Sequence, residues 1–101
     1  MSFAENLAAL PSTDHLAAVE LTGPGGEVVR IDNIPGSQGS VRVYAYLLGK
    51  YGAIDAGAAA AGLALYAEHT ADARASPGKH PNIDRLLAIL DDGRACHGQV
   101  V

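Results

Sequence analysis

The chain has 101 residues, of which 49% are hydrophobic and 18% charged, and this balance is typical of one globular domain spanning residues 1–101. Its formal net charge is −4 and its seven Lys and Arg residues are scattered, so we expect no nucleic-acid groove and no polybasic membrane surface. A single cysteine, the lack of a basic leader and the lack of an apolar run of bilayer length predict a cytoplasmic protein.

The first predicted element is a short helix over residues 3–10. Its apolar residues recur at helical spacing, Ser2 is a candidate N-cap, and Pro11 ends the segment.

A β-hairpin is predicted next, over residues 17–32. Apolar and polar residues alternate on both sides of "GPGG", which indicates two strands with one buried face. In the turn, Pro24 fits position i+1 and Gly25 the positive φ of position i+2 in a type II turn, while Gly26 suits a bulge. Because two strands alone are marginally stable in water, we expect a third strand, a covering helix or a second subunit. The segment "HGQVV" near residue 100 is a candidate third strand.

The segment from Val41 to Tyr51 fits either a helix or a strand, because its apolar residues share one helical face and also alternate. We favour a helix, since Ser40 suits its N-cap and Gly52 suits the left-handed position after its end. Valine and tyrosine favour strands, so the strand alternative stays open.

Two more helices follow in the prediction. Asp55 caps a long helix over residues 56–75, which ends before a Pro-Gly pair. Asn82 caps a last helix over residues 83–92, and Gly93 ends it. The apolar face of this last helix comprises Ile83, Leu86, Leu87 and Leu90. The predicted fold is a small α+β domain, in which an antiparallel β-hairpin or sheet is covered by three to four helices.

Ionisable residues are concentrated in segment 68–85. Glu68, His69 and Asp72 lie within about one turn of each other on the predicted long helix. In a functional interpretation the three bind a metal ion, or His69 acts as a base oriented by Asp72. In a structural interpretation nearby Arg and Lys side chains neutralise the carboxylates and join two helices. We favour the structural interpretation, since structural ion-pair networks also gather titratable groups. The spacing also matches no zinc pattern.

A second candidate site is the glycine-rich segment "PGSQGS". Because it precedes a helix, its backbone N–H groups can turn toward an anion at the helix N-terminus, with Arg42 completing the cradle. The segment lacks the lysine and the spacing of a P-loop, and an ordinary loop before a helix is the structural alternative. The candidate anion-binding residues are Gly36, Ser37, Gly39, Ser40, Arg42, Lys79 and His80.

Two stretches, "GSQGSVRVYAYLLGKYG" and "GLALYAEHTADARASPGKHPNIDRLL", carry a family resemblance. The sequence resembles a small uncharacterised bacterial family, a domain of unknown function, and the His-Pro-Asn-Ile-Asp stretch is its clearest mark. This resemblance implies a bacterial cytosolic protein of about this length. It implies no activity, cofactor or catalytic residue.

The sequence contains no diagnostic catalytic motif, so whether the protein is an enzyme stays open. We expect a non-enzymatic binding or interaction module that acts as a homodimer, because the hairpin needs an extra partner and the Ala/Gly-rich helix suits close packing. An alternative is a protein that binds a small anion, a phosphate or a carboxylate. A third hypothesis is a metal-dependent enzyme centred on Glu68, His69 and Asp72, and no cofactor is predicted.

Overall fold

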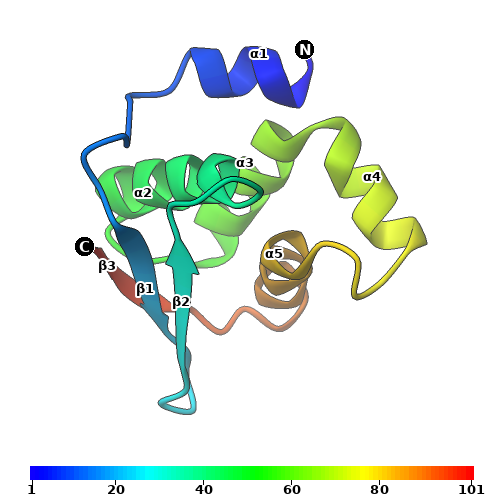
Figure 1. The fold of residues 1–101 in the computed structure, drawn as a ribbon. Coiled ribbons are helices and arrows are strands. Elements are labelled where there is room, and N and C mark those ends of the chain that lie inside the picture. Colours follow the sequence, from blue (N-terminus) through cyan, green and yellow to red (C-terminus); the bar gives the residue numbers. More distant parts are fainter.

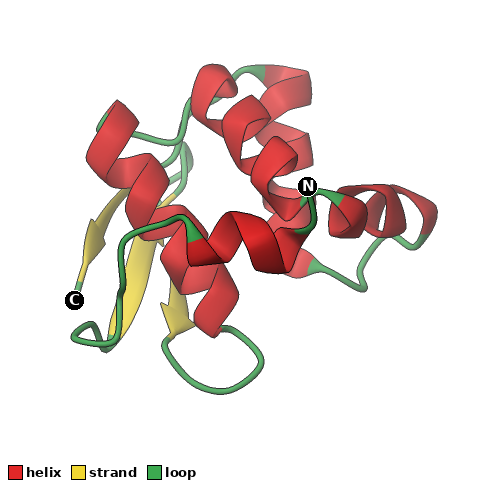
Figure 2. Cartoon of the chain, turned by 90° about the horizontal axis from the view of Figure 1, so that it is seen from above, coloured by secondary structure: helices red, strands yellow, loops and turns green.

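The structure is a computed structural model that describes residues 1–101, and it combines one antiparallel sheet with five helices. The strands gather on one side of the molecule and most of the helices on the other (Figures 1 and 2). The α+β fold class predicted from the sequence is confirmed. The elements in chain order are α1 (Phe3–Ala8), β1 (Ala18–Thr22), β2 (Val28–Asp32), α2 (Gln38–Tyr51), α3 (Ala56–Tyr66), α4 (Glu68–Ala75), α5 (Pro81–Asp92) and β3 (His97–Val100).

Strand β1 is the central strand, and β2 and β3 pair with it on either side in antiparallel orientation. The register places Val19 opposite both Ile31 and Val100. Val19 and Leu21 are fully buried on one face of the sheet, as the alternation of the sequence predicts, and α2 packs against all three strands. The predicted third strand in "HGQVV" is confirmed.

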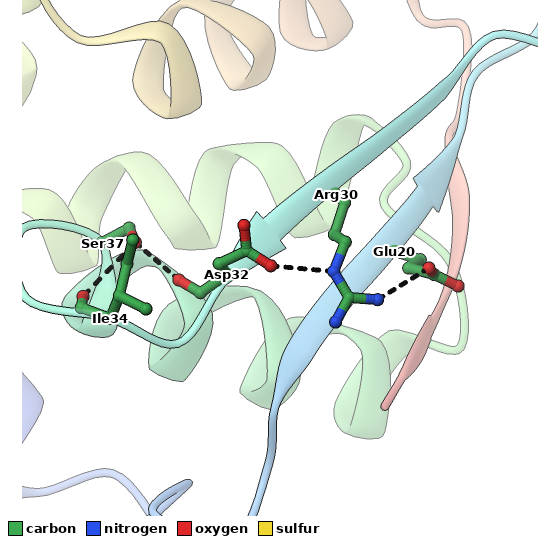
Figure 3. A network of polar contacts seen from close by, with 5 residues as sticks. All are labelled: Glu20, Arg30, Asp32, Ile34 and Ser37. Carbon is green, nitrogen blue, oxygen red and sulfur yellow. Dashed lines mark hydrogen bonds and ion pairs between the residues drawn. The ribbon is translucent and has the colours of Figure 1, made fainter.

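The opposite face of the sheet carries a small ionic network (Figure 3). Arg30 donates from Nη1 to Glu20 Oε2 (3.0 Å) and from Nε to Asp32 Oδ1 (2.8 Å). These side chains are between 33% and 54% exposed to water, so the ion pairs contribute little to stability. Beside them the Ser37 hydroxyl donates to the main-chain oxygen of Asp32 (2.5 Å) and closes the turn from β2 into α2.

The turn between β1 and β2 differs from the prediction at one position. The Gly26 N–H donates to the Gly23 oxygen (3.0 Å), so Pro24 and Gly25 are the two central residues. The positive φ falls on Gly26 (+86°) and not on Gly25, which excludes a type II turn. The pattern is that of a type I turn followed by a left-handed glycine bulge, whose twist matches that of the flanking strands. The bulge expected at Gly26 is therefore confirmed.

Helix α2 settles the choice between helix and strand in favour of the helix. It begins three residues before the predicted start, since the Ser37 and Gln38 N–H groups both donate to the Ile34 oxygen and turn the chain early. Ser37 rather than Ser40 is the N-cap, and Ser40 lies in the first turn. Gly52 (φ +79°) ends the helix as predicted.

The predicted helix over residues 56–75 is two helices, which is a correction to the sequence analysis. Asp55 caps the first of them through a hydrogen bond from the Ala58 N–H (2.8 Å), as expected. Helix α3 ends at Tyr66, and Ala67 has φ +51° and ψ −116°. The chain changes direction at this point before α4 begins (Figure 1).

Side chains from α1 and α4 donate hydrogen bonds to main-chain oxygens near the end of α3. The Asn6 amide, on α1, donates to the Leu65 oxygen (2.9 Å). The Thr70 hydroxyl, on α4, donates to the Leu63 oxygen (2.6 Å). These tertiary and local hydrogen bonds offset the cost of interrupting the helix at a residue type that favours helices.

Because Ala67 adopts a backbone conformation that suits glycine, we expect Ala67→Gly to raise the free energy of unfolding by about 1 kcal/mol. The same substitution at Ala60, which is exposed in the middle of α3, should lower it by about 1 kcal/mol. Urea unfolding followed by circular dichroism measures both changes. Destabilisation by Ala67→Gly as large as that by Ala60→Gly would contradict the strained backbone.

Helix α5 begins at Pro81, two residues earlier than predicted. Its N-cap is His80 rather than Asn82, because Pro81 occupies the first helical position, where its missing N–H costs nothing. Gly93 ends the helix in the left-handed conformation (φ +72°), as expected.

The core extends from the sheet across α2 to α3 and α5, and its largest fully buried side chains include Tyr44, Leu47 and Leu86. Gly62 of α3 faces Leu47 and Leu86 with no room for a side chain. None of the helices combines the length and the apolar character that crossing a membrane requires.

Candidate functional site

A cleft of about 280 Å³ opens where the N-terminal ends of α2 and α5 approach α1, α3 and α4. The cleft brings together two of the predicted anion-binding segments, which are far apart in the sequence. From the segment before and within α2 come Gly36, Gly39 and Ser40, and from the connector before α5 come Lys79 and His80. Its remaining lining residues are Phe3, Tyr66, His69, Pro81, Asn82 and Ile83.

The two helix ends provide main-chain donors at this cleft. The N–H groups of Gly39, Ser40 and Asn82 have no acceptor in the protein, as expected for residues in the first turn of a helix. The N-terminal ends of α2 and α5 each carry a partial positive charge from the helix dipole. The cleft therefore has a local preference for negative charge although the whole chain is acidic.

Ser40 adds a side-chain donor to the cleft. Its Oγ accepts a hydrogen bond from the hydroxyl of Tyr66 (2.8 Å), and its own hydroxyl proton has no acceptor in the protein. Burial raises the pKa of Tyr66, so the phenol keeps its proton and continues to donate to Ser40. The Ser40 hydroxyl is thus left free to donate to a ligand.

Asp72 positions the two basic residues of the connector. Its Oδ2 lies 2.6 Å from His80 Nε2 and 3.1 Å from Lys79 Nζ. The hydrogen bonds from His80 and Lys79 hold the pKa of the Asp72 carboxyl below its ordinary value. The carboxylate therefore stays ionised and joins α4 to the connector, while the side chain of Lys79 remains 61% exposed at the rim of the cleft.

Aromatic rings form another wall of the cleft. The ring of Phe3 stacks on Tyr66, and the ring of His69 meets Phe3 edge to face, both with centroids 5.1 Å apart. The His69 ring lies 5.8 Å from that of His80. The sequence analysis did not place Phe3, Tyr66 or Asn82 at a site, and no local motif marks them.

Two of the predicted anion-binding residues lie outside the cleft. Arg42 donates to the main-chain oxygens of Leu10 (2.7 Å) and Pro11 (3.0 Å), and so holds the segment after α1 against α2. Ser37 uses its hydroxyl in the turn after β2. Both side chains have structural partners in the chain.

The structure does not bring the three candidate metal ligands together. Glu68 accepts a hydrogen bond from the Phe3 N–H (2.7 Å), which lowers the pKa of the Glu68 carboxyl. Asp72 pairs with the connector, and His69 lies against Phe3. No group of three or more His, Cys, Asp or Glu side chains in residues 1–101 is arranged to hold a metal ion. This geometry gives the metal hypothesis no support, and the partner of Asp72 is His80 rather than His69.

Buried polar contacts fix the position of the α5 end of the cleft. The Tyr44 hydroxyl donates to the Asn82 main-chain oxygen (2.5 Å) and accepts from Arg85 Nη1 (3.1 Å). Arg85 Nη1 also donates to Asn82 Oδ1 (3.0 Å), and Arg85 forms no ion pair with a carboxylate. Burial raises the pKa of Tyr44 to about 12, and the hydroxyl keeps the proton that it donates.

Comparison with known proteins places the chain in a family. Searches of curated proteins and of solved structures found no similar protein. A family model described as an uncharacterised protein conserved in bacteria (DUF2322) matches residues 3–100, nearly the whole chain, and includes every residue of the cleft. The resemblance drawn from the sequence is therefore confirmed: the chain belongs to the DUF2322 family of bacterial proteins.

Proposed function

We propose that the protein is a binding protein that holds a small anion, a phosphate or a carboxylate, in the cleft between the N-terminal ends of α2 and α5. One observation gives this proposal its main support: the N-terminal ends of α2 and α5 lie at the same cleft, which is also lined by Lys79, His69 and His80. A free anion commonly binds where main-chain N–H groups and a helix dipole point at one position.

The donors of the cleft suit a group with several oxygens. The N–H groups of Gly39, Ser40 and Asn82, the Ser40 hydroxyl and the Lys79 ammonium provide donors from two helices. Asp72 neutralises part of the charge of Lys79, so it also limits how strongly the cleft attracts anions. No serine, threonine or cysteine is hydrogen-bonded to a histidine, and a binding role fits these contacts better than nucleophilic catalysis does.

The two lysines of the chain provide a matched test, since Lys79 lines the cleft and Lys50 is exposed on α2. We expect inorganic phosphate or citrate to raise the melting temperature at constant ionic strength, with about 2.7 kcal/mol of stabilisation at one hundred times the Kd. Lys79→Ala should weaken the binding at least tenfold, and Lys50→Ala should leave it unchanged. Isothermal titration calorimetry measures the affinities.

Ser40→Ala provides a second variant, which removes one donor and should weaken binding without changing the charge of the cleft. The proposal fails if neither anion stabilises the protein more than an equal ionic strength of chloride does. Equal losses of affinity in Lys79→Ala and Lys50→Ala would also contradict it, because they would indicate nonspecific attraction.

A further inference from the structure

The edge of strand β3 is the least protected part of the sheet. All four of its residues are exposed, and β3 pairs with β1 along one edge only. We propose that a second copy of this chain binds along the free edge of β3 in antiparallel orientation. The two sheets then form one continuous sheet of six strands in the order β2-β1-β3-β3-β1-β2.

The hydrogen bonds at the two ends of the strand show which main-chain groups face outward. Val101 exchanges hydrogen bonds with Ala18, toward β1, whereas Cys96 exchanges hydrogen bonds with Ile54 on the opposite side. Because the direction alternates along a strand, Gly98 and Val100 point their N–H and C=O groups away from β1. None of these four groups has a partner within the chain.

The outward-facing N–H and C=O groups of Gly98 and Val100 can pair with those of a second copy related by a two-fold axis at Gln99. If Gln99 of one copy lies opposite Gln99 of the other, then Gly98 of each copy lies opposite Val100 of the other. Both of these are pairs of outward-facing residues, so each exchanges two hydrogen bonds, and the interface gains four. The register is therefore self-complementary without any rearrangement of β3.

Charge also distinguishes the two edges of the sheet. Strand β3 contains no Lys, Arg, Asp or Glu, and its axis residue Gln99 is uncharged. The same antiparallel two-fold pairing along the β2 edge would place Arg30, the central residue of β2, opposite the Arg30 of the second copy. Like charges that lie directly opposite are destabilising, and edge charges are a known protection against strand pairing. The β2 edge is protected in this way and the β3 edge is not.

An exposed apolar surface continues from the same edge. Val100, 49% exposed, forms one wall of an open groove of about 430 Å³ that also includes Leu16, Ala45 and Tyr46. A strand added beside β3 would cover Val100 and the neighbouring part of this groove.

Val100→Pro is the sharpest test, because it removes an N–H that faces outward and leaves the pairing of β3 with β1 intact. We expect light scattering after size exclusion to report a dimer for the wild type and half that molar mass for Val100→Pro. Far-ultraviolet circular dichroism should be the same for both. A wild type that is monomeric from micromolar to millimolar concentration would overturn the proposal.

Charged substitutions of Gln99, the residue on the proposed two-fold axis, test the strand register of the dimer. Gln99→Lys and Gln99→Glu should each be monomeric, and an equimolar mixture of the two should restore the dimer. Thr22→Lys, an exposed change on the same face of β1, is the control and should stay dimeric. A dimer that persists in Val100→Pro and in both Gln99 variants would place the interface elsewhere and refute this one. The inference does not depend on anion binding in the cleft.

Discussion

Replacing Leu86 with alanine should lower the free energy of unfolding by about 3–4 kcal/mol, because this substitution truncates a fully buried side chain. A domain of this size has about 5–15 kcal/mol of stability in total, so the melting temperature should fall by roughly 15 °C or more. Thermal and urea unfolding monitored by circular dichroism measure both quantities.

The size of this effect follows from the position of Leu86. Its side chain is fully buried and contacts the backbone of α3 at Gly62, where it fills the space between α5 and α3. Leu47 of α2 approaches the same glycine, so the neighbours of Leu86 are already in close contact with one another. They cannot move far enough to fill the cavity that alanine would leave.

Leu90 is a matched control on the same helix. The substitution Leu90→Ala removes the same atoms, but this side chain is 42% exposed, and we expect a loss below about 1 kcal/mol. If the two variants lose similar free energy, the described packing of α5 is wrong.

The same pair of leucines shows how far periodicity determines the fold. The apolar spacing in α5 predicted its helix and its buried face, including Leu86, since one stripe of a surface helix must face the core. It also assigned Leu90 to that face. Periodicity gives the angle of a residue around the helix, whereas the extent of the neighbouring elements determines how much of the stripe is covered.

The break at Ala67 was beyond prediction from the local sequence. Ala64, Leu65 and Glu68 lie close to it in the sequence, and these residue types favour an uninterrupted helix. The contacts that accompany the break involve Asn6, which lies 59 residues before its partner Leu65, and the hydroxyl of Thr70. Long-range hydrogen bonds of this kind leave no periodic signal.

The candidate cleft was predictable in part, and for chemical reasons. A glycine-rich segment before a helix marked Gly36, Gly39 and Ser40, and a basic connector marked Lys79 and His80. That the two segments share one cleft depends on the packing of α2 against α5. Nothing in the sequence indicated that Arg42 lies outside the cleft. Its side chain instead binds main-chain oxygens between α1 and β1.

The charged residues in segment 68–85 both connect two helices and position Lys79 and His80 at the cleft. Asp72 joins α4 to the connector through Lys79 and His80, as the structural interpretation expected. The same contacts place both basic residues on the wall of the cleft. One ion pair therefore links two helices and orients candidate ligand-binding groups.

Gly62→Val should be about as damaging as the loss of Leu86, and for the opposite reason. A Cβ at Gly62 would lie 2.7 Å from a Leu86 methyl group and 2.9 Å from a Leu47 methyl group, closer than carbon atoms pack. Both leucines are fully buried, so they cannot turn aside, and we expect a loss of about 3 kcal/mol measured by urea unfolding.

Gly49 separates this steric effect from the general effect of glycine in a helix. It lies within α2, and a Cβ added there meets nothing within 4 Å. Valine and glycine differ by less than about 0.5 kcal/mol in helix propensity, so Gly49→Val should leave the stability nearly unchanged. A loss at Gly62 no larger than that at Gly49 would show that α3 and α5 are farther apart than described. A large loss at Gly62 alone would show that the close approach of these helices requires a residue without a side chain, because the leucines of α2 and α5 occupy that space.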